Sequence, residues 1–110
     1  MLIGTDLVEK NDAVAVHLAG GYKQGMTGVA QRDEAIKAGA QGSISIAALG
    51  GKLVIPPDNK NLADLAPVEN IRLKREFGPS NGDLIIIGFG KTQGFALAGA
   101  LAAVLSIKKA

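Results

Sequence analysis

Apolar positions dominate the last third of this chain, where a continuous apolar run precedes a helix-like segment. Leu84 to Ile87 is a short β-branched run, which is typical of a strand buried on both faces. After a glycine turn over residues 88–94, the small and aliphatic side chains of 95–109 predict a helix in close contact with a sheet or another helix. Because this helix is so apolar, we expect the chain's own beginning or a neighbouring copy to cover it.

Shorter patterns in the first half predict two more strands and a second helix. Residues 2–5 and 13–18 are strand candidates, and apolar residues alternate in the latter. Thr27 is a candidate N-cap for a helix over residues 29–40, whose charges have helical spacing. A glycine at position 39 or 42 would end that helix.

The segment after this helix has two interpretations. Residues 43–46 alternate like a strand, and Gly50 with Gly51 would turn a hairpin into residues 52–55. Alternatively, the helix continues to about Leu49, within the usual boundary error of roughly two to four residues.

The remaining patterns complete an α+β architecture. Residues 61–65 predict one helical turn, and the alternation over 71–76 predicts a strand before the turn at 78–82. We therefore expect one domain over residues 1–110, a single-sheet α/β sandwich of four to five short strands with two main helices.

Composition narrows the classes of function. The chain is 47% hydrophobic but only 4% aromatic, its net charge is +2, and it has no cysteine. Near-balanced charge argues against nucleic acid as a partner, and the cysteine count excludes disulfides and thiolate zinc sites. The longest apolar run is shorter than the about 20 residues that span a bilayer, so we expect no membrane contact and a cytoplasmic location.

No motif predicts catalysis, a metal or a cofactor. The sequence Gly88-Phe89-Gly90-Lys91-Thr92 lacks the earlier glycine of a phosphate loop. His17 is the chain's one histidine and has no second ligand at a metal spacing. We therefore expect a structural histidine and no enzyme. The carboxylates expected at helix surfaces and turns are Asp33, Glu34, Asp58 and Asp64.

One cationic cluster lies in the segment interpreted as a strand. It comprises Arg72, Lys74 and Arg75, with Phe77 beside it. Such charges commonly protect an edge strand from aggregation, and RNA binding is the alternative use.

A family resemblance emerges when Ala110 is joined to Met1. The order then runs from the strand at 84–87 through Lys91-Thr92-Gln93-Gly94 and an alanine-rich helix into Met1-Leu2-Ile3-Gly4. This order resembles the hexameric shell proteins of bacterial microcompartments, in circularly permuted form. Four further motifs of this family are similar to segments of the chain. They are Ala13-Val14-Ala15-Val16-His17-Leu18, Glu34-Ala35-Ile36-Lys37-Ala38-Gly39-Ala40, Val54-Ile55-Pro56 and the short helix over Leu62 to Pro67.

The resemblance implies a structural shell subunit that forms a homohexamer or pentamer. Its partners would be other copies, other shell proteins and enclosed enzymes, and residues 68–82 would connect the original termini. Glu9, Lys10, Asn11 and Asp12 would line an axial pore for small metabolites. The edge between neighbouring oligomers would include Lys108, Pro56 and Pro57.

A second hypothesis from the residues is a small-molecule-binding regulatory module. In that interpretation the glycine loops at 19–28 and 88–94 hold an anion or a nucleotide. It predicts a ligand-dependent shift in melting temperature.

Overall fold

The computed structural model describes the backbone of residues 12–109 and the side chains of residues 12–107. The elements, in chain order, are β1 (Asp12–Leu18), α1 (Val29–Lys37), β2 (Gly42–Leu49), β3 (Lys52–Ile55), β4 (Lys60–Asn61), α2 (Leu62–Leu65), α3 (Pro67–Phe77), β5 (Leu84–Gly90) and α4 (Gln93–Lys109). The strand predicted over residues 2–5 lies outside the described residues.

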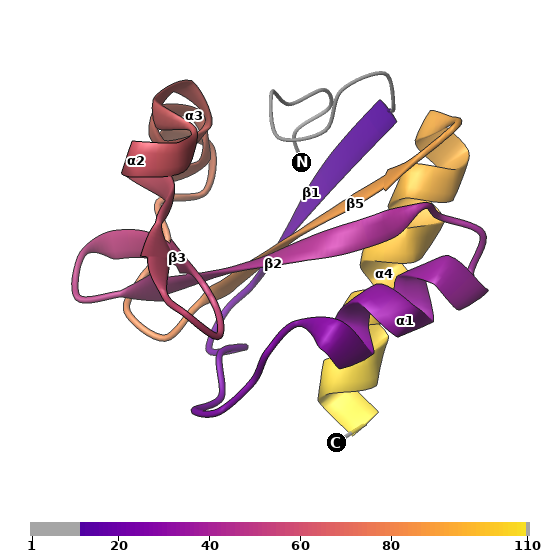
Figure 1. Ribbon diagram of the computed structural model, residues 1–110, viewed down its shortest axis with the longest axis horizontal. Helices are drawn as coiled ribbons and strands as arrows, with labels where there is room; N and C mark the ends of the chain where they lie inside the picture. Colours follow the sequence, from indigo (N-terminus) through magenta and orange to yellow (C-terminus); the bar gives the residue numbers. More distant parts are fainter. Residues whose placement is uncertain (1–11, 110) are drawn as a thin grey trace.

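The five strands form one antiparallel sheet in the order β1-β5-β2-β3-β4 (Figure 1). The apolar strand β5 is central, between β1 and β2, with Ile86 opposite Val16 on one side and Ser45 on the other. Its residues Leu84–Ile87 are all buried. The predicted α+β single-sheet sandwich is confirmed.

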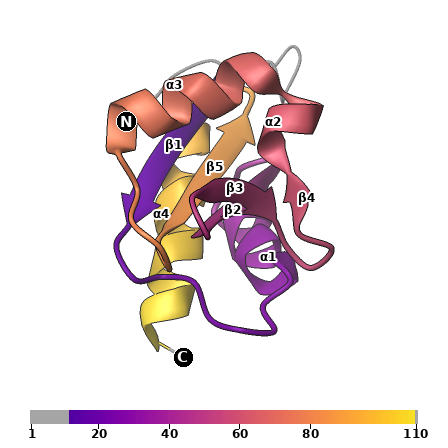
Figure 2. The same cartoon turned by 90° about the vertical axis from the view of Figure 1, so that its left-hand side faces the viewer.

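Helices lie on both faces of the sheet (Figures 1 and 2). The residues of β5 alternate between the two faces. On one face, α2 and α3 contribute buried side chains to a cluster with odd-numbered residues of β5. On the other face, α4 packs on even-numbered residues of β5 and on β1, and α1 packs on β2 and α4. The first cluster contains Ala13, Ala15, Ile46, Ala48, Leu53, Leu62, Ala66, Leu73, Ile85 and Ile87.

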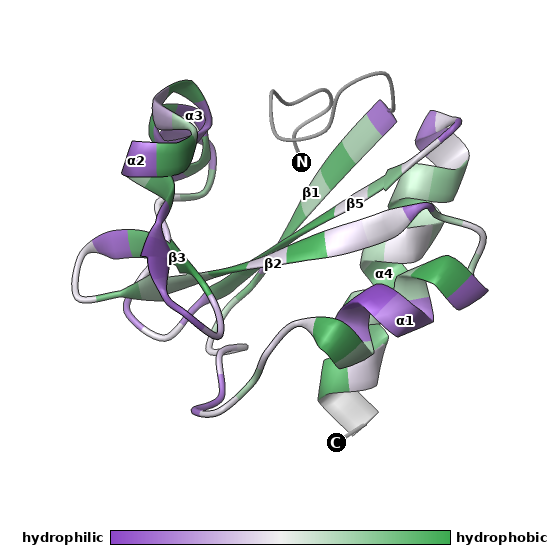
Figure 3. Ribbon diagram, in the orientation of Figure 1, coloured by the Kyte–Doolittle hydropathy of each residue, from purple (hydrophilic) through white to green (hydrophobic). Residues whose placement is uncertain are grey.

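Small residues allow α4 to approach β5 and α1 closely. A methyl group added to Gly88 would collide with the backbone of Ala96, and one added to Gly99 would collide with Ala40. In Figure 3 most of α4 is pale to green, whereas the middle of α1 is purple. The predicted close packing of the terminal helix is confirmed, with β5, β1 and α1 as its partners.

The strand predicted over residues 71–76 is wrong, because this segment belongs to helix α3. Pro67 stands at its first turn and Gly78 follows its end at φ 49°, the usual proline-to-glycine asymmetry of helices. Leu73 is fully buried while Ile71 is 56% exposed. In a strand these two side chains would share a face. The cationic cluster is therefore on a helix rather than on an edge strand.

The structure also distinguishes the two interpretations of the segment after the first helix, a hairpin or a longer helix. Helix α1 ends at Lys37, and Gly39 follows at φ 103°, so the extension to Leu49 is wrong and the hairpin is confirmed. The N-cap is Gly28 rather than Thr27. The Thr27 hydroxyl nevertheless accepts a hydrogen bond from the Val29 N–H at 3.2 Å.

Within residues 12–109, none of the helices is both long and apolar enough to cross a membrane.

Candidate functional site

A cavity of about 190 Å³ lies where the N-terminus of α1 meets β2 and the end of β3. Its walls come from the loop before α1, from the first turn of that helix and from both strands. The lining residues are Thr27, Gly28, Val29, Arg32, Ser43, Ile44, Ser45, Ile55 and Pro56.

Two serine hydroxyls in this cavity have no hydrogen-bond partner. The Oγ atoms of Ser43 and Ser45 are both buried and unpaired, and Ser45 is only 5% exposed. The two residues are two positions apart on β2, so they share the face that carries α1. A buried hydroxyl without a partner costs about 1–3 kcal/mol in protein mutational data. The burial of both serine hydroxyls in this cavity therefore destabilises the fold unless a ligand pairs with them.

The N-cap residue of the helix above these hydroxyls supplies no side-chain cap, although the Val29 N–H donates to the Thr27 hydroxyl. Gly28 is the N-cap residue, with φ 86°, and no acidic residue lies in the first turn of this nine-residue helix. A methyl group built on Gly28 would lie 3.4 Å from the Ser45 Oγ atom, so the helix N-terminus stands directly over this hydroxyl. Helix N-termini attract anions through their free N–H groups and the helix dipole.

Arg32 adds a positive charge at the rim of the cavity. Its Nε atom is 3.9 Å from Asp33 Oδ1, and both side chains are more than half exposed. An exposed pair of this kind is worth about 0–1 kcal/mol, so the guanidinium can turn to another anion at small cost.

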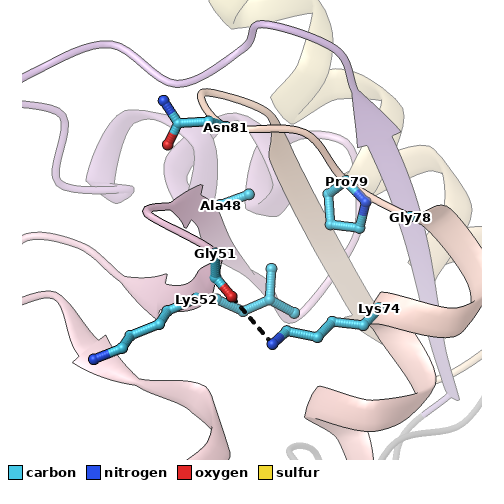
Figure 4. A pocket seen from close by; sticks show the side chains of 8 residues that line it. Ala48, Gly51, Lys52, Lys74, Gly78, Pro79 and Asn81 are labelled. Carbon is cyan, nitrogen blue, oxygen red and sulfur yellow. Dashed lines mark hydrogen bonds between the residues drawn. The ribbon is translucent and has the colours of Figure 1, made fainter.

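A second cavity, of about 340 Å³, lies between the β2–β3 hairpin, the end of α3 and the loop before β5 (Figure 4). The Lys74 Nζ atom donates to the Gly51 carbonyl at 3.2 Å, whereas Lys52 extends away from this contact (Figure 4). Asn81 Oδ1 accepts from the Gly50 N–H at 2.9 Å. These two hydrogen bonds connect the β2–β3 hairpin to α3 and to the loop before β5.

His17 and Asp83 form the most connected polar pair of the described residues. The His17 Nε2 atom is 2.8 Å from Asp83 Oδ2. The Asp83 carboxylate also accepts the N–H groups of Gly20 at 2.8 Å and Ser80 at 2.9 Å. These two N–H groups, and then His17, lower the pKa of Asp83 to about 2. The pair connects the loops that contain Gly20 and Ser80 to β1, the strand that carries His17.

Comparison with protein families gives one match. A model described as a domain of unknown function, DUF4443, covers residues 8–107. The chain belongs to this family. No curated protein matches the sequence of this DUF4443 domain.

A solved structure of similar fold is the hypothetical protein PH0730 from Pyrococcus horikoshii OT3. It is 24% identical, with a TM-score of 0.81, and the match covers 98% of the DUF4443 chain and 55% of that protein. The chain thus spans about half the length of this structure. At this identity the likeness shows the fold alone.

The residues implied by the shell-protein resemblance do not all fall within the described part. Glu9, Lys10 and Asn11 lie outside it, and so does the side chain of Lys108. Asp12 is exposed at the start of β1, opposite Gly90. Pro56 is buried at the α1 cavity, whereas Pro57 is exposed.

The two glycine loops proposed to hold an anion have different outcomes. The interpretation of 88–94 as a loop is wrong, because residues 88–90 continue β5 and α4 begins at Gln93. The loop 19–28, in contrast, leads to the cavity at α1, where Thr27 and Gly28 are lining residues. This loop therefore borders the cavity at α1, whereas residues 88–94 are not among its lining residues.

The sequence interpretation missed Ser43 and Ser45 as site residues. Their alternation with Ile44 and Ile46 was the available signal, because small polar side chains recur on one face of a strand that is covered by a helix. The alternation alone did not show that α1 covers the face that carries the two serines.

The other charged candidates lie at the surface. Asp33, Asp58 and Asp64 are exposed and Glu34 is partly exposed, as expected. Arg72 Nη1 donates to Glu69 Oε1 at 3.0 Å, so this arginine and Lys74 both make contacts within the fold. No group of three or more potential metal-ligating side chains occurs in the described region.

Proposed function

We propose that this domain binds a small molecule through an oxyanion group, at the N-terminus of α1. The observation that carries the proposal is the pair of buried, unpaired hydroxyls, Ser43 and Ser45, beneath a helix end whose N-cap residue is a glycine. A bound oxyanion would accept hydrogen bonds from both hydroxyls and from the free N–H groups of the first turn. It would thereby offset the cost of burying these polar groups.

Charge and space at the site support the same proposal. Arg32 supplies a cation, and the first turn of α1 contains no carboxylate that would repel an anion. The volume of about 190 Å³ exceeds the roughly 10–15 Å³ needed by one water and falls short of a drug-sized pocket of about 300 Å³ or more. The site thus suits one small group, with the rest of the ligand toward solvent.

The test is to titrate the domain with inorganic phosphate at constant ionic strength and to monitor the amide chemical shifts by NMR. We expect saturable shifts at Gly28, Val29 and Ser45. Ser45→Ala should weaken binding about tenfold or more, because a hydrogen bond to a charged group is worth about 1.5–3 kcal/mol. The matched control is Ser80→Ala, which removes an exposed hydroxyl and should leave affinity unchanged. Shifts that do not saturate, or equal affinities for both variants, would refute the proposal.

A second candidate function is that of a ring-forming shell subunit in the cytoplasm. The observation in its favour is the pairing of β1 with β5, which places the C-terminal strand-and-helix unit beside the first described strand. The strand that the resemblance places directly after this unit, Met1-Leu2-Ile3-Gly4, lies outside the described residues. Light scattering over a range of concentrations tests this candidate function, with pentamers, hexamers or larger sheets expected; a monomer throughout would exclude the shell function.

A further inference from the structure

The donors around the α1 cavity lie on three sides. Ser43 and Ser45 come from β2 below, and the first turn of α1 lies over them, since Gly28 stands above Ser45. Arg32, one turn into the helix, borders the same cavity. Side chains two residues apart on one strand face are separated by about 6–7 Å along the strand, so the two hydroxyls approach a bound group from different positions.

This arrangement matches the shape of a tetrahedral group better than that of a planar one. A carboxylate presents two oxygens in one plane, whereas a phosphoryl group presents three strong acceptor oxygens. A carboxylate would use the donors of two sides and leave the others unpaired. Three terminal oxygens allow the hydroxyls, the helix N–H groups and the guanidinium each to find an acceptor.

Charge distinguishes phosphate from other tetrahedral groups. A phosphate monoester carries about −1.5 to −2 charges at neutral pH, while a sulfate ester has the same shape and a single charge. The helix N-terminus and Arg32 both favour the larger negative charge. Asp33, 3.9 Å from Arg32, is the nearby carboxylate, and it is more than half exposed rather than directed into the cavity wall.

From these features we infer that the ligand is a phosphate monoester and that Arg32 determines its selectivity. This inference rests on the proposed oxyanion site. The two serines and the helix end hold the phosphoryl group. The guanidinium binds two of its oxygens in the fork geometry that arginine provides and lysine does not. Ile55 and Pro56, which are apolar residues of the cavity lining, would contact the alcohol part of the ester.

Three small probes separate the possible classes: methyl phosphate, methyl sulfate and acetate. Their affinities for the full chain are measured by calorimetry at one pH and one ionic strength. We expect methyl phosphate to bind at least about tenfold more tightly than methyl sulfate, because the phosphate monoester carries the larger negative charge. Acetate should bind most weakly.

Two matched variants test the role of Arg32. Arg32→Gln should reduce the preference for methyl phosphate over methyl sulfate to about threefold or less, and Arg32→Lys should restore it only in part. Arg75→Gln, at an exposed arginine on α3, should leave both affinities unchanged. The melting temperature of each variant without ligand shows whether the fold is retained.

The outcomes distinguish this inference from the proposed function. If all three probes bind equally, the phosphate class is overturned while the oxyanion site stands. If the preference survives in Arg32→Gln, the role of Arg32 is overturned. If none of the probes binds at millimolar concentration, both the inference and the proposed function fail.

Discussion

The His17 Nε2 atom lies 2.8 Å from the Asp83 Oδ2 atom, and this contact joins β1 to the residue that precedes β5. The Phe77 ring of α3 packs against the imidazole, with centroids 5.6 Å apart. The same carboxylate accepts hydrogen bonds from the Gly20 and Ser80 N–H groups. The buried Asp83 side chain therefore connects β1 with the loop after β1 and the loop before β5.

This carboxylate should make stability depend on pH in the acid range. The folded-state pKa of Asp83, about 2, is below the unfolded value of about 3.9. Its contribution is therefore complete above about pH 4 and is lost as the pH falls from about 4 toward about 2. Urea unfolding at several pH values should show this loss, and Asp83→Asn should flatten the slope in that window. The control is Asp58→Asn at an exposed turn; equal slopes in both variants would contradict the assignment.

Removing the Ser45 hydroxyl should stabilise the domain when no ligand is present. The Oγ atom is buried without a partner, so Ser45→Ala relieves a desolvation cost and should raise the free energy of unfolding by about 1 kcal/mol. Denaturant titration in phosphate-free buffer measures this, with Ser80→Ala expected near zero. A loss of stability in Ser45→Ala would mean that the hydroxyl has a partner in the folded protein.

Gly88 should tolerate no side chain. A methyl group there would enter the backbone of Ala96 on α4, and overpacking of this kind costs about 1–3 kcal/mol or more. The Gly88→Ala variant should therefore unfold at a lower urea concentration than the unsubstituted protein. Gly94→Ala is the matched control on α4, because its nearest contact would be Thr92 Oγ1 at 3.8 Å. Similar midpoints for the two variants would refute close packing of α4 on β5.

Truncations of two side chains on α3 should differ sharply in their effect on the free energy of unfolding, although the residues are only two positions apart. Leu73 is fully buried and Ile71 is 56% exposed. Leu73→Ala should cost about 2–5 kcal/mol, whereas Ile71→Ala should change the unfolding free energy by about 0.5 kcal/mol or less. Equal costs, measured by urea unfolding, would indicate that both side chains share a buried face, as in a strand.

The local patterns predicted β1, β2, β3 and β5, because each is a short alternating or continuous apolar run. The alternation in Ala13–Leu18 and the apolar run at Leu84–Ile87 both correspond to observed strands. The error over residues 71–76 arose because Ile71 and Leu73 suggest period two, while the helix is specified by Pro67, Gly78 and a buried face that includes Leu73. Short windows do not separate these two periods.

The sequence by itself determined the apolar strand β5 and the small-residue helix α4, because these features depend on residues close together along the chain. Only the tertiary structure decided that β5 pairs with β1 and β2, and that the N-terminus of α1 lies over Ser45. Strand order and buried cavities depend on contacts between distant segments, and the same serine would be an ordinary surface residue if α1 covered another part of the sheet.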